Sequence, residues 1–202
     1  MKIKNVIFDF GQVLVHFEPE YMVGKYVENK EDAKILEEVV FDRLYWDRLD
    51  LGTISNEEVI SECKKRLPER LHCYVEQIYY NWIYNIPQID GMKELISYLK
   101  STYHVKLCLL SNISPYFISH KDEIEILKEI DLCVFSGELQ IVKPSYEIFA
   151  HLCKNAEILP QESIFIDDSA KNIEGAKAFG LHTYLFDKDA SRLKSYLDSI
   201  LK

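Results

Sequence analysis

The sequence predicts an α/β protein in which helices flank a parallel sheet and a helical insert follows the first strand. Short β-branched and aromatic runs, bounded by glycine or polar residues, are typical of strands buried on both faces. Helical segments alternate with these runs from residue 91 onward, which favours a parallel sheet with right-handed crossovers. Between about residues 17 and 87 the periodicity is helical, and no strong alternating strand pattern occurs.

The first expected strand is the apolar run at residues 6–8, which Asp9 and Gly11 follow. We expect four further strands, at residues 105–110, 132–135, 163–166 and 182–186. Helices are expected after Gly91, after Pro115, from Pro144 through Leu152, at residues 170–179 before Gly180, and from Ser191 to the end. Gly11 is expected to let the chain turn sharply and a ligand approach the backbone.

Within the helical insert, residues 55–58 form a capping box, in which a serine precedes a glutamate by three positions. This pattern predicts a helix to about Arg66, before Pro68, and another aromatic-rich helix follows at residues 75–84. The predicted organisation is therefore a core of residues 1–16 and 88–202, interrupted by an all-helical domain of residues 17–87.

Composition excludes several classes of partner. The net charge of −9 over 202 residues argues against nucleic acid or an anionic membrane as the main partner. No segment approaches the ~18 apolar residues of a membrane span. The five cysteines are an odd, dispersed set without a CxxC motif, which fits a reducing compartment. We therefore expect a cytoplasmic protein, either a monomer or a homodimer.

Polar residues follow four of the expected strands. They are Asp9, Ser111 with Asn112, Lys143, and Asp167 with Asp168. In a doubly wound sheet the carboxyl ends of the strands share one edge, so these groups can converge in one crevice. Three carboxylates in one pocket repel one another and need a cation, and oxygen ligands suit Mg²⁺.

This group of residues fits phosphoryl transfer. Asp9 can attack a phosphoryl group to form an aspartyl-phosphate, which water then releases. Mg²⁺ and Lys143 would offset charge on the phosphoryl oxygens, while Ser111 and backbone N–H groups donate hydrogen bonds to them.

Four motifs resemble those of the haloacid dehalogenase (HAD) superfamily: FDFGQVLV, LLSN, VKP and FIDDSAKNIEGA, in this order. The resemblance implies a Rossmann-like core, with the helical insert as a C1 cap. It implies Asp9 as the nucleophile and Gly11, Ser111, Asn112 and Lys143 around the phosphate. Asp168, with Asp167 beside it, would bind Mg²⁺ together with Asp9 and the carbonyl of Gly11. Asn172 matches a position that supports the metal site.

The motifs and the phrase WDRLDLGTISNEE are similar to a subgroup of bacterial sugar-phosphate phosphatases that includes α-D-glucose-1-phosphate phosphatase. One position departs from the superfamily: Gly11 stands where most of its phosphatases carry the aspartate that acts as general acid and base. Loss of that group costs ~10²–10⁴-fold, least for a good leaving group such as a sugar anomeric oxygen. A small hexose 1-phosphate is therefore the favoured substrate, and His16 is a candidate replacement acid.

Two alternatives remain open from the sequence. A 2-haloacid dehalogenase shares the nucleophile and the SN motif but uses no metal, and the acidic pair at residues 167–168 would repel its substrate. A HAD-fold binding protein weakened in catalysis would explain Gly11. Substrate choice is assigned to the cap, where the candidates to face the crevice are Tyr45, Trp46, Arg48 and Asp50.

Overall fold

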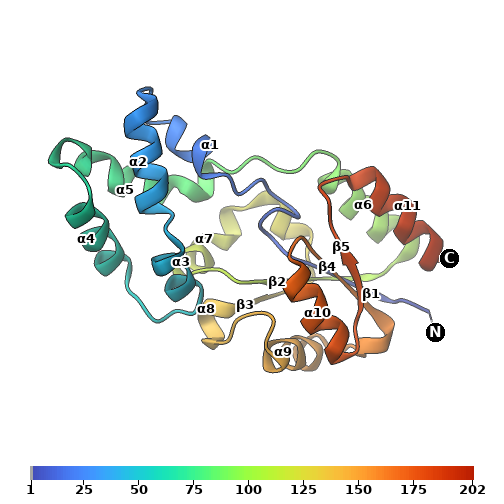
Figure 1. Ribbon diagram of the computed structural model, residues 1–202. Helices are drawn as coiled ribbons and strands as arrows, with labels where there is room; N and C mark the ends of the chain where they lie inside the picture. The colour runs from blue at the N-terminus through green and yellow to red at the C-terminus, as the bar shows by residue number, and fades with distance from the viewer. Residues whose placement is uncertain (1) are drawn as a thin grey trace.

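A computed structural model describes residues 2–202 and contains one five-stranded sheet in the order β3-β2-β1-β4-β5 (Figure 1). All four neighbouring pairs run parallel, so the predicted doubly wound α/β fold is confirmed. The strands are β1 (Asn5–Phe8), β2 (Lys106–Ser111), β3 (Leu132–Phe135), β4 (Ser163–Asp167) and β5 (His182–Leu185).

The sheet lies between two layers of helices because its inner strands are apolar on both faces. In β1, Val6 and Phe8 pack into one core cluster and Ile7 packs into the other. The first cluster includes apolar residues of α6 (Met92–Tyr103) and α11 (Ala190–Ile200), and the second includes those of α9 (Tyr146–Ala156) and α10 (Ala170–Phe179). This double burial is the environment that a continuous apolar strand predicts.

Shorter helices connect these layers. They are α7 (Pro115–His120), α8 (Ser136–Leu139) and the 3₁₀ helices Lys121–Glu123, Glu125–Glu129 and Pro160–Glu162. The end of α10 before Gly180 is confirmed, but the predicted start of α9 at Pro144 is wrong by two residues. Pro144 lies instead in a turn that the Ser145 N–H closes on the Val142 carbonyl at 3.0 Å, after a cis peptide bond from Lys143.

Between β1 and α6 the regular elements are all helical, apart from isolated β-bridges of Val15 with Gly11 and with Gln88. The helical elements are α1 (Pro19–Gly24), α2 (Lys30–Val40), α3 (Arg43–Asp50), α4 (Asn56–Arg66), α5 (His72–Asn81) and the 3₁₀ helices Glu69–Leu71 and Trp82–Tyr84. The capping box is confirmed at α4, where Ser55 Oγ accepts a hydrogen bond from the Glu58 N–H at 3.1 Å. The helix expected at residues 75–84 begins three residues earlier and ends as a 3₁₀ turn.

The chain enters and leaves this insert along neighbouring segments. The His16 N–H donates to the Pro87 carbonyl at 2.8 Å, and the Ile89 N–H donates to the Leu14 carbonyl at 3.0 Å. In Figure 1 the helices α1 to α5 lie together at the left, beyond the sheet. The division into two domains at residues 17 and 87 stays a prediction.

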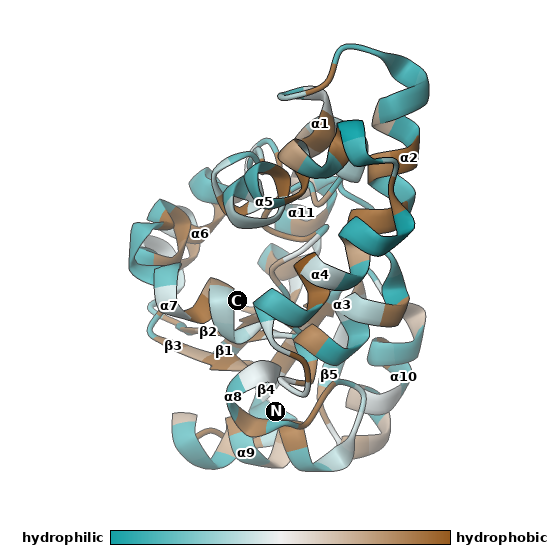
Figure 2. Ribbon diagram, turned by 90° about the vertical axis from the view of Figure 1, so that its left-hand side faces the viewer, coloured by the Kyte–Doolittle hydropathy of each residue, from teal (hydrophilic) through white to brown (hydrophobic). Residues whose placement is uncertain are grey.

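An aromatic cluster fills the space between the insert and the core. The rings of Phe17 and Trp46 lie 5.2 Å apart, those of Trp46 and Trp82 5.5 Å apart, and Trp82 stacks on Phe117 of α7 at 5.7 Å. Such pairs each contribute about 0.5–1.5 kcal/mol beyond the area that they bury. Figure 2 shows brown stretches beside teal ones on the insert helices, as expected for helices with one apolar face.

Among residues 2–202, no helix combines the length and the apolar character that crossing a membrane requires.

Gly175 lets α10 pack directly against the turn that carries Lys143. A Cβ at Gly175 would lie 2.4 Å from Pro144 Cβ and 2.9 Å from the Pro144 carbonyl oxygen. We expect Gly175→Ala to lower the free energy of unfolding by about 1–3 kcal/mol, because overpacking forces backbone shifts. Urea denaturation measures the change. In the control Gly24→Ala, nothing lies within 4 Å of the added Cβ, so an equal loss there would contradict the explanation.

Candidate active site

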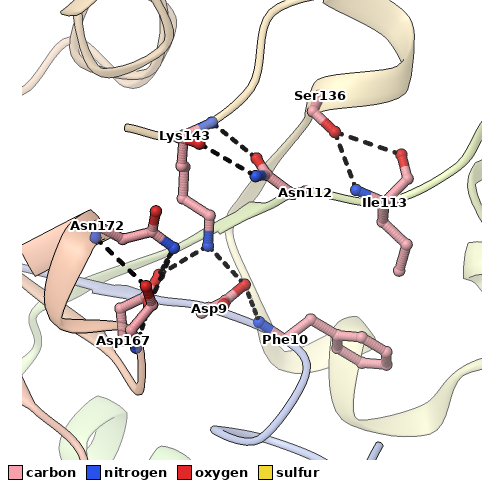
Figure 3. Close-up of polar contacts among 9 residues, drawn as sticks. Asp9, Phe10, Asn112, Ile113, Ser136, Lys143, Asp167 and Asn172 are labelled. Atoms are coloured by element: carbon pink, nitrogen blue, oxygen red, sulfur yellow. Dashed lines mark hydrogen bonds and ion pairs between the residues drawn. The ribbon is translucent and has the colours of Figure 1, made fainter. Parts of the chain in front are cut away.

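The predicted polar residues converge at the carboxyl edge of the sheet. Asp9 directly follows β1, Ser111 ends β2 and Asp167 ends β4, and β1 pairs with both neighbouring strands in register. Lys143 reaches the same edge from the loop between α8 and α9 (Figure 3). The parallel sheet therefore brings together residues that are more than a hundred positions apart in the sequence.

The Lys143 ammonium lies between two carboxylates. Its Nζ is 2.8 Å from Asp9 Oδ1 and 2.7 Å from Asp167 Oδ2, and its side chain is 1% exposed. Burial by itself lowers the pKa of Lys143, but the charges of Asp9 and Asp167 outweigh burial and raise that pKa. The lysine is therefore a permanent cation at neutral pH, held where a substrate anion would need one.

Asp167 accepts several hydrogen bonds from the residues that follow it in the sequence. Besides Lys143, Asn172 Nδ2 lies 3.1 Å from both of its carboxylate oxygens, and the Ser169 N–H donates to Oδ1 at 2.8 Å. Asp167 is fully buried, and a buried carboxylate is tolerated only when it is paired and hydrogen-bonded. In this structure Asp167 therefore serves mainly to hold the Lys143 ammonium in place.

Asp9 has fewer partners and faces open space. The Phe10 N–H and Lys143 both interact with Oδ1, at 2.7 and 2.8 Å. Burial raises the pKa of Asp9 to about 7; Lys143 opposes this rise and the Asp167 charge adds to it. The site contains more carboxylate charge than Lys143 can neutralise, and a further cation would favour the ionised form of Asp9.

The donor set fits a hard divalent cation. Asp9, Asp167 and Asp168 each offer one carboxylate oxygen, and these three atoms lie within 4.8 Å of one another. Burial and the Asp167 charge raise the pKa of Asp168, which is the most exposed of the three. All-oxygen ligands with room for water are what Mg²⁺ prefers. Lys143 and Asn172 already donate hydrogen bonds to the Asp167 carboxylate. The Asp168 carboxylate is therefore more available to bind a cation.

Asn112 contacts the backbone of Lys143. Its Oδ1 accepts from the Lys143 N–H at 2.8 Å, and its Nδ2 donates to the Lys143 carbonyl at 3.3 Å. Both functional ends of the amide are therefore used to fix the lysine loop. The expected contact of Asn112 with phosphate stays a prediction, and positioning Lys143 is the contact that the structure shows.

A cavity of about 150 Å³ opens beside Asp9, between the sheet edge and the insert. Its lining consists of Asp9, Phe10, Gly11, Gln12, Phe17, Arg43, Trp46, Asp50, Trp82, Ser111, Asn112 and Ile113. Two of the four insert residues that the sequence suggested, Trp46 and Asp50, line this cavity.

The other suggested residues lie outside the lining. Tyr45 is buried within the insert under the Arg66 guanidinium, and Arg48 faces Glu58 at 3.6 Å. His16 has its Nδ1 3.7 Å from Glu18 Oε1 at the entry to the insert. The candidate acid His16 is therefore not placed against Asp9.

Sequence reasoning missed Arg43, Phe17 and Trp82 as cavity residues. Arg43, Trp46 and Asp50 are spaced i, i+3, i+7, so they share one face of α3. That helical spacing was the available signal. Tyr45 and Arg48 occupy other faces of the same helix.

The expectation that Gly11 makes the sharp turn after Asp9 is wrong. The positive φ of this turn, 58°, belongs to Gln12, whose Nε2 holds the loop by donating to the Phe17 carbonyl at 2.8 Å. A Cβ at Gly11 would meet only Phe17 Cβ, at an ordinary 3.7 Å. The backbone therefore does not require glycine at position 11, and a Cβ fits there without a clash.

The sequence matches the family model of haloacid dehalogenase-like hydrolases over residues 3–180. The chain belongs to this family. A D-ribitol-5-phosphate phosphatase of Bacteroides thetaiotaomicron is 28% identical to it over 191 residues, which cover 90% of this chain and 91% of that protein. A phosphorylated carbohydrates phosphatase of Thermotoga maritima is 22% identical over 182 residues, covering 89% and 82%.

A solved HAD family enzyme of Bacteroides thetaiotaomicron, bt-2542, in complex with magnesium and inorganic phosphate, shares the fold. Its TM-score is 0.69 at 20% identity, covering 95% of this chain and 98% of that one. These findings support the HAD family and sugar-phosphate phosphatases as relatives. They do not single out the glucose-1-phosphate subgroup that the sequence resembles.

We expect Lys143→Met to destabilise the metal-free HAD protein by about 3–5 kcal/mol, because it leaves two buried carboxylates without their shared cation. Denaturant unfolding in EDTA measures the loss. The control Lys177→Met removes an exposed lysine of α10 and should change stability by less than about 0.5 kcal/mol. A small loss at Lys143, similar to the control, would contradict the role of the ion pair.

Proposed function

We propose that this HAD protein is a Mg²⁺-dependent phosphatase that hydrolyses a small sugar or sugar-alcohol phosphate through an aspartyl-phosphate on Asp9. The observation that carries the proposal is the arrangement around Asp9: a cavity beside it, Lys143 at 2.8 Å, and two further carboxylates within reach of one cation. A cytoplasmic location stays part of the proposal, supported by the dispersed cysteines.

Each residue has a defined task in this reaction. An oxygen of Asp9 forms a bond to phosphorus as the bond between phosphorus and the leaving oxygen breaks. The leaving oxygen takes up a proton and departs as an alcohol. Water then attacks phosphorus, which releases inorganic phosphate and regenerates the Asp9 carboxylate. The Ser111 hydroxyl, which lines the cavity, donates a hydrogen bond to the phosphoryl oxygens, and the Lys143 ammonium offsets their charge.

The proposed metal ligands are Asp9, Asp168 and the Gly11 carbonyl, with Asp167 beside them. Bound Mg²⁺ would offset the charge of the carboxylates and of the incoming phosphate. Without such a cation, two anions would have to meet in a buried site that already raises the pKa of Asp9.

Cavity size and lining support a small polyol phosphate. The volume of about 150 Å³ is below the roughly 300 Å³ at which drug-sized ligand sites begin. Phe17, Trp46 and Trp82 provide apolar faces on which a sugar can pack. Hexose 1-phosphates and pentitol 5-phosphates are the two substrate groups to compare, the second because of the relative named for D-ribitol 5-phosphate.

The dehalogenase alternative makes an opposite prediction about metal. A phosphatase of the proposed kind stops in EDTA and recovers with Mg²⁺, whereas dehalogenation of 2-haloacids would survive the chelator. Asp167 and Asp168 favour the phosphatase, since their charge would oppose a substrate carboxylate beside Asp9.

We expect Asp9→Asn to lower phosphatase turnover by about 10³-fold or more, because an amide cannot form the aspartyl-phosphate. Phosphate release from a panel of sugar phosphates and p-nitrophenyl phosphate, with Mg²⁺, measures the loss. Circular dichroism checks that the variant folds, and the exposed Asp122→Asn serves as the charge-matched control. Full activity of Asp9→Asn would refute the covalent mechanism.

We expect Mg²⁺ to bind and to raise the thermal midpoint of the parent protein, since a ligand at 100 times its Kd stabilises by about 2.7 kcal/mol. Asp168→Asn should weaken Mg²⁺ binding at least about tenfold, because it removes a direct ligand and not merely a supporting partner. Isothermal titration calorimetry with Mg²⁺ alone measures the affinity independently of turnover. The prediction fails if Asp168→Asn binds as tightly as the Asp122→Asn control.

A further inference from the structure

The proposed reaction needs a proton donor for the leaving oxygen, and position 11, where most HAD phosphatases carry it, is glycine. A different carboxyl group lies in the same cavity, on the other wall. We propose that Asp50, at the end of α3, is the general acid and base of this active site. The inference rests on the phosphatase activity proposed above and identifies a residue that carries its proton transfers.

Asp50 lines the cavity together with Asp9 and Ser111, but it comes from the insert and not from the sheet edge. In an in-line displacement the leaving oxygen lies on the side of phosphorus away from the attacking atom. With Asp9 attacking from the strand end, that side is the one that the insert covers. Asp50 is thus on the wall toward which a leaving group must point.

Three contacts fix this part of the insert to the core. Ser136 Oγ donates to the Asp50 carbonyl and itself accepts from the Ile113 N–H at 2.9 Å. Gln140 Nε2 donates to the Gly52 carbonyl at 3.3 Å. Gly52, at φ 68°, packs so closely that a Cβ there would lie 2.6 Å from the Gly137 carbonyl oxygen. The backbone at Asp50 is therefore positioned by α8, the short helix that follows β3.

Asp50 is largely buried, and its carboxyl group borders the cavity without a partner among the described residues. Asp50 is 8% exposed, and among residues 2–202 the structure shows no hydrogen bond or ion pair to its carboxyl oxygens. An unpaired buried carboxyl group is costly unless it is neutral or meets a ligand. A substrate oxygen in the cavity would supply the missing partner.

The surroundings of Asp50 favour a carboxyl group that holds its proton. Burial raises the pKa of Asp50 to about 7. The nearby charges act in both directions: Arg43 and Lys143 lower this pKa, while Asp47 and Asp9 raise it. An acid whose pKa lies near the working pH is suited to give and to take a proton.

Two proton transfers balance the reaction. As Asp9 bonds to phosphorus, protonated Asp50 gives its proton to the oxygen that leaves, so an alcohol departs and Asp50 becomes a carboxylate. In the second half, that carboxylate removes a proton from the attacking water while the bond between phosphorus and Asp9 breaks. Inorganic phosphate leaves, and both carboxyl groups return to their starting states.

This assignment changes the expected substrate class. Without a general acid, only a good leaving group such as an anomeric oxygen departs readily. With Asp50 as the donor, the primary alkoxide of a sugar alcohol or of a terminal sugar phosphate becomes accessible. With this role for Asp50, we expect the enzyme to accept primary phosphates of small polyols and not to be restricted to anomeric 1-phosphates.

The test compares Asp50→Asn with the parent protein on two leaving groups. For a primary alkyl phosphate such as ribitol 5-phosphate, kcat should fall about 10²–10⁴-fold, because the departing alkoxide is not protonated. For p-nitrophenyl phosphate, phosphorylation of Asp9 should persist while hydrolysis of the phosphoenzyme slows. Stopped-flow absorbance should then show a burst of about one equivalent of p-nitrophenolate, followed by slow turnover.

Asp32→Asn is the matched control. It makes the same change elsewhere in the insert, at a carboxylate that pairs with the exposed Arg70 outside the cavity. The double variant Gly11→Asp with Asp50→Asn adds a carboxyl group at position 11, where a Cβ meets no closer atom than Phe17 Cβ at 3.7 Å. Recovery of the alkyl phosphate rate in this folded double variant supports proton transfer as the lost function. Equal losses on both leaving groups without a burst, or a change only in KM, would overturn the assignment of Asp50.

These outcomes are separable from failure of the proposed function. If the protein is not a phosphatase of this kind, the parent itself turns over neither substrate, or Asp9→Asn is as active as the parent. If only the role of Asp50 is wrong, the parent and Asp9→Asn behave as proposed, and Asp50→Asn retains the alkyl phosphate rate of Asp32→Asn.

Discussion

The site depends on one buried contact, the Lys143 ammonium enclosed between Asp9 and Asp167. A buried lysine without these carboxylates would deprotonate or move toward solvent. Two buried carboxylates without the lysine would separate or become protonated. The parallel ladder already holds the ends of β1 and β4 side by side, and the two ion pairs fix the loop before α9 against them. Asn112 holds the lysine backbone from β2. Four segments of the chain are therefore coupled through one cation.

That contact leaves the charge of the site unbalanced, and the imbalance is what a ligand can use. Lys143 pairs with Asp9 and Asp167, Asp168 adds a third carboxylate beside them, and burial raises the pKa of Asp9 and of Asp168. The folded protein holds these groups in place through its hydrogen bonds, as active sites commonly do at some cost in stability. A divalent cation relieves the repulsion, and a phosphate then meets a site with more positive charge. Binding of metal and of substrate are thus expected to favour each other.

The sheet and the residues at its edge were predictable, because buried parallel strands have a strong local pattern and their carboxyl ends must share one edge. The start of α9 was not, since the turn before it depends on how Pro144 meets Gly175 across the fold. The sequence could not tell that Trp46 and Asp50, and not Tyr45 and Arg48, line the cavity. That depends on the rotation of α3 about its axis, which packing against the core determines. The turn at Gln12 was missed because a positive φ is expected first of glycine.

A catalytic acid on the insert would join proton transfer to closure of the cavity. The contacts that place Asp50, from Ser136 and Gln140, exist only when the insert lies against α8. Each such hydrogen bond is worth about 0.5–1.5 kcal/mol net, and the Trp82–Phe117 stack contributes a similar amount. Tyr116 Oη donating to the Tyr80 carbonyl and Tyr84 Oη donating to Glu123 hold the insert to the core as well, so opening the cavity would have to break this whole set. An acid at position 11 would remain beside Asp9 in the open state. One at position 50 would face Asp9 only in the closed state, so both proton transfers, including the one from the attacking water, would take place inside the closed cavity.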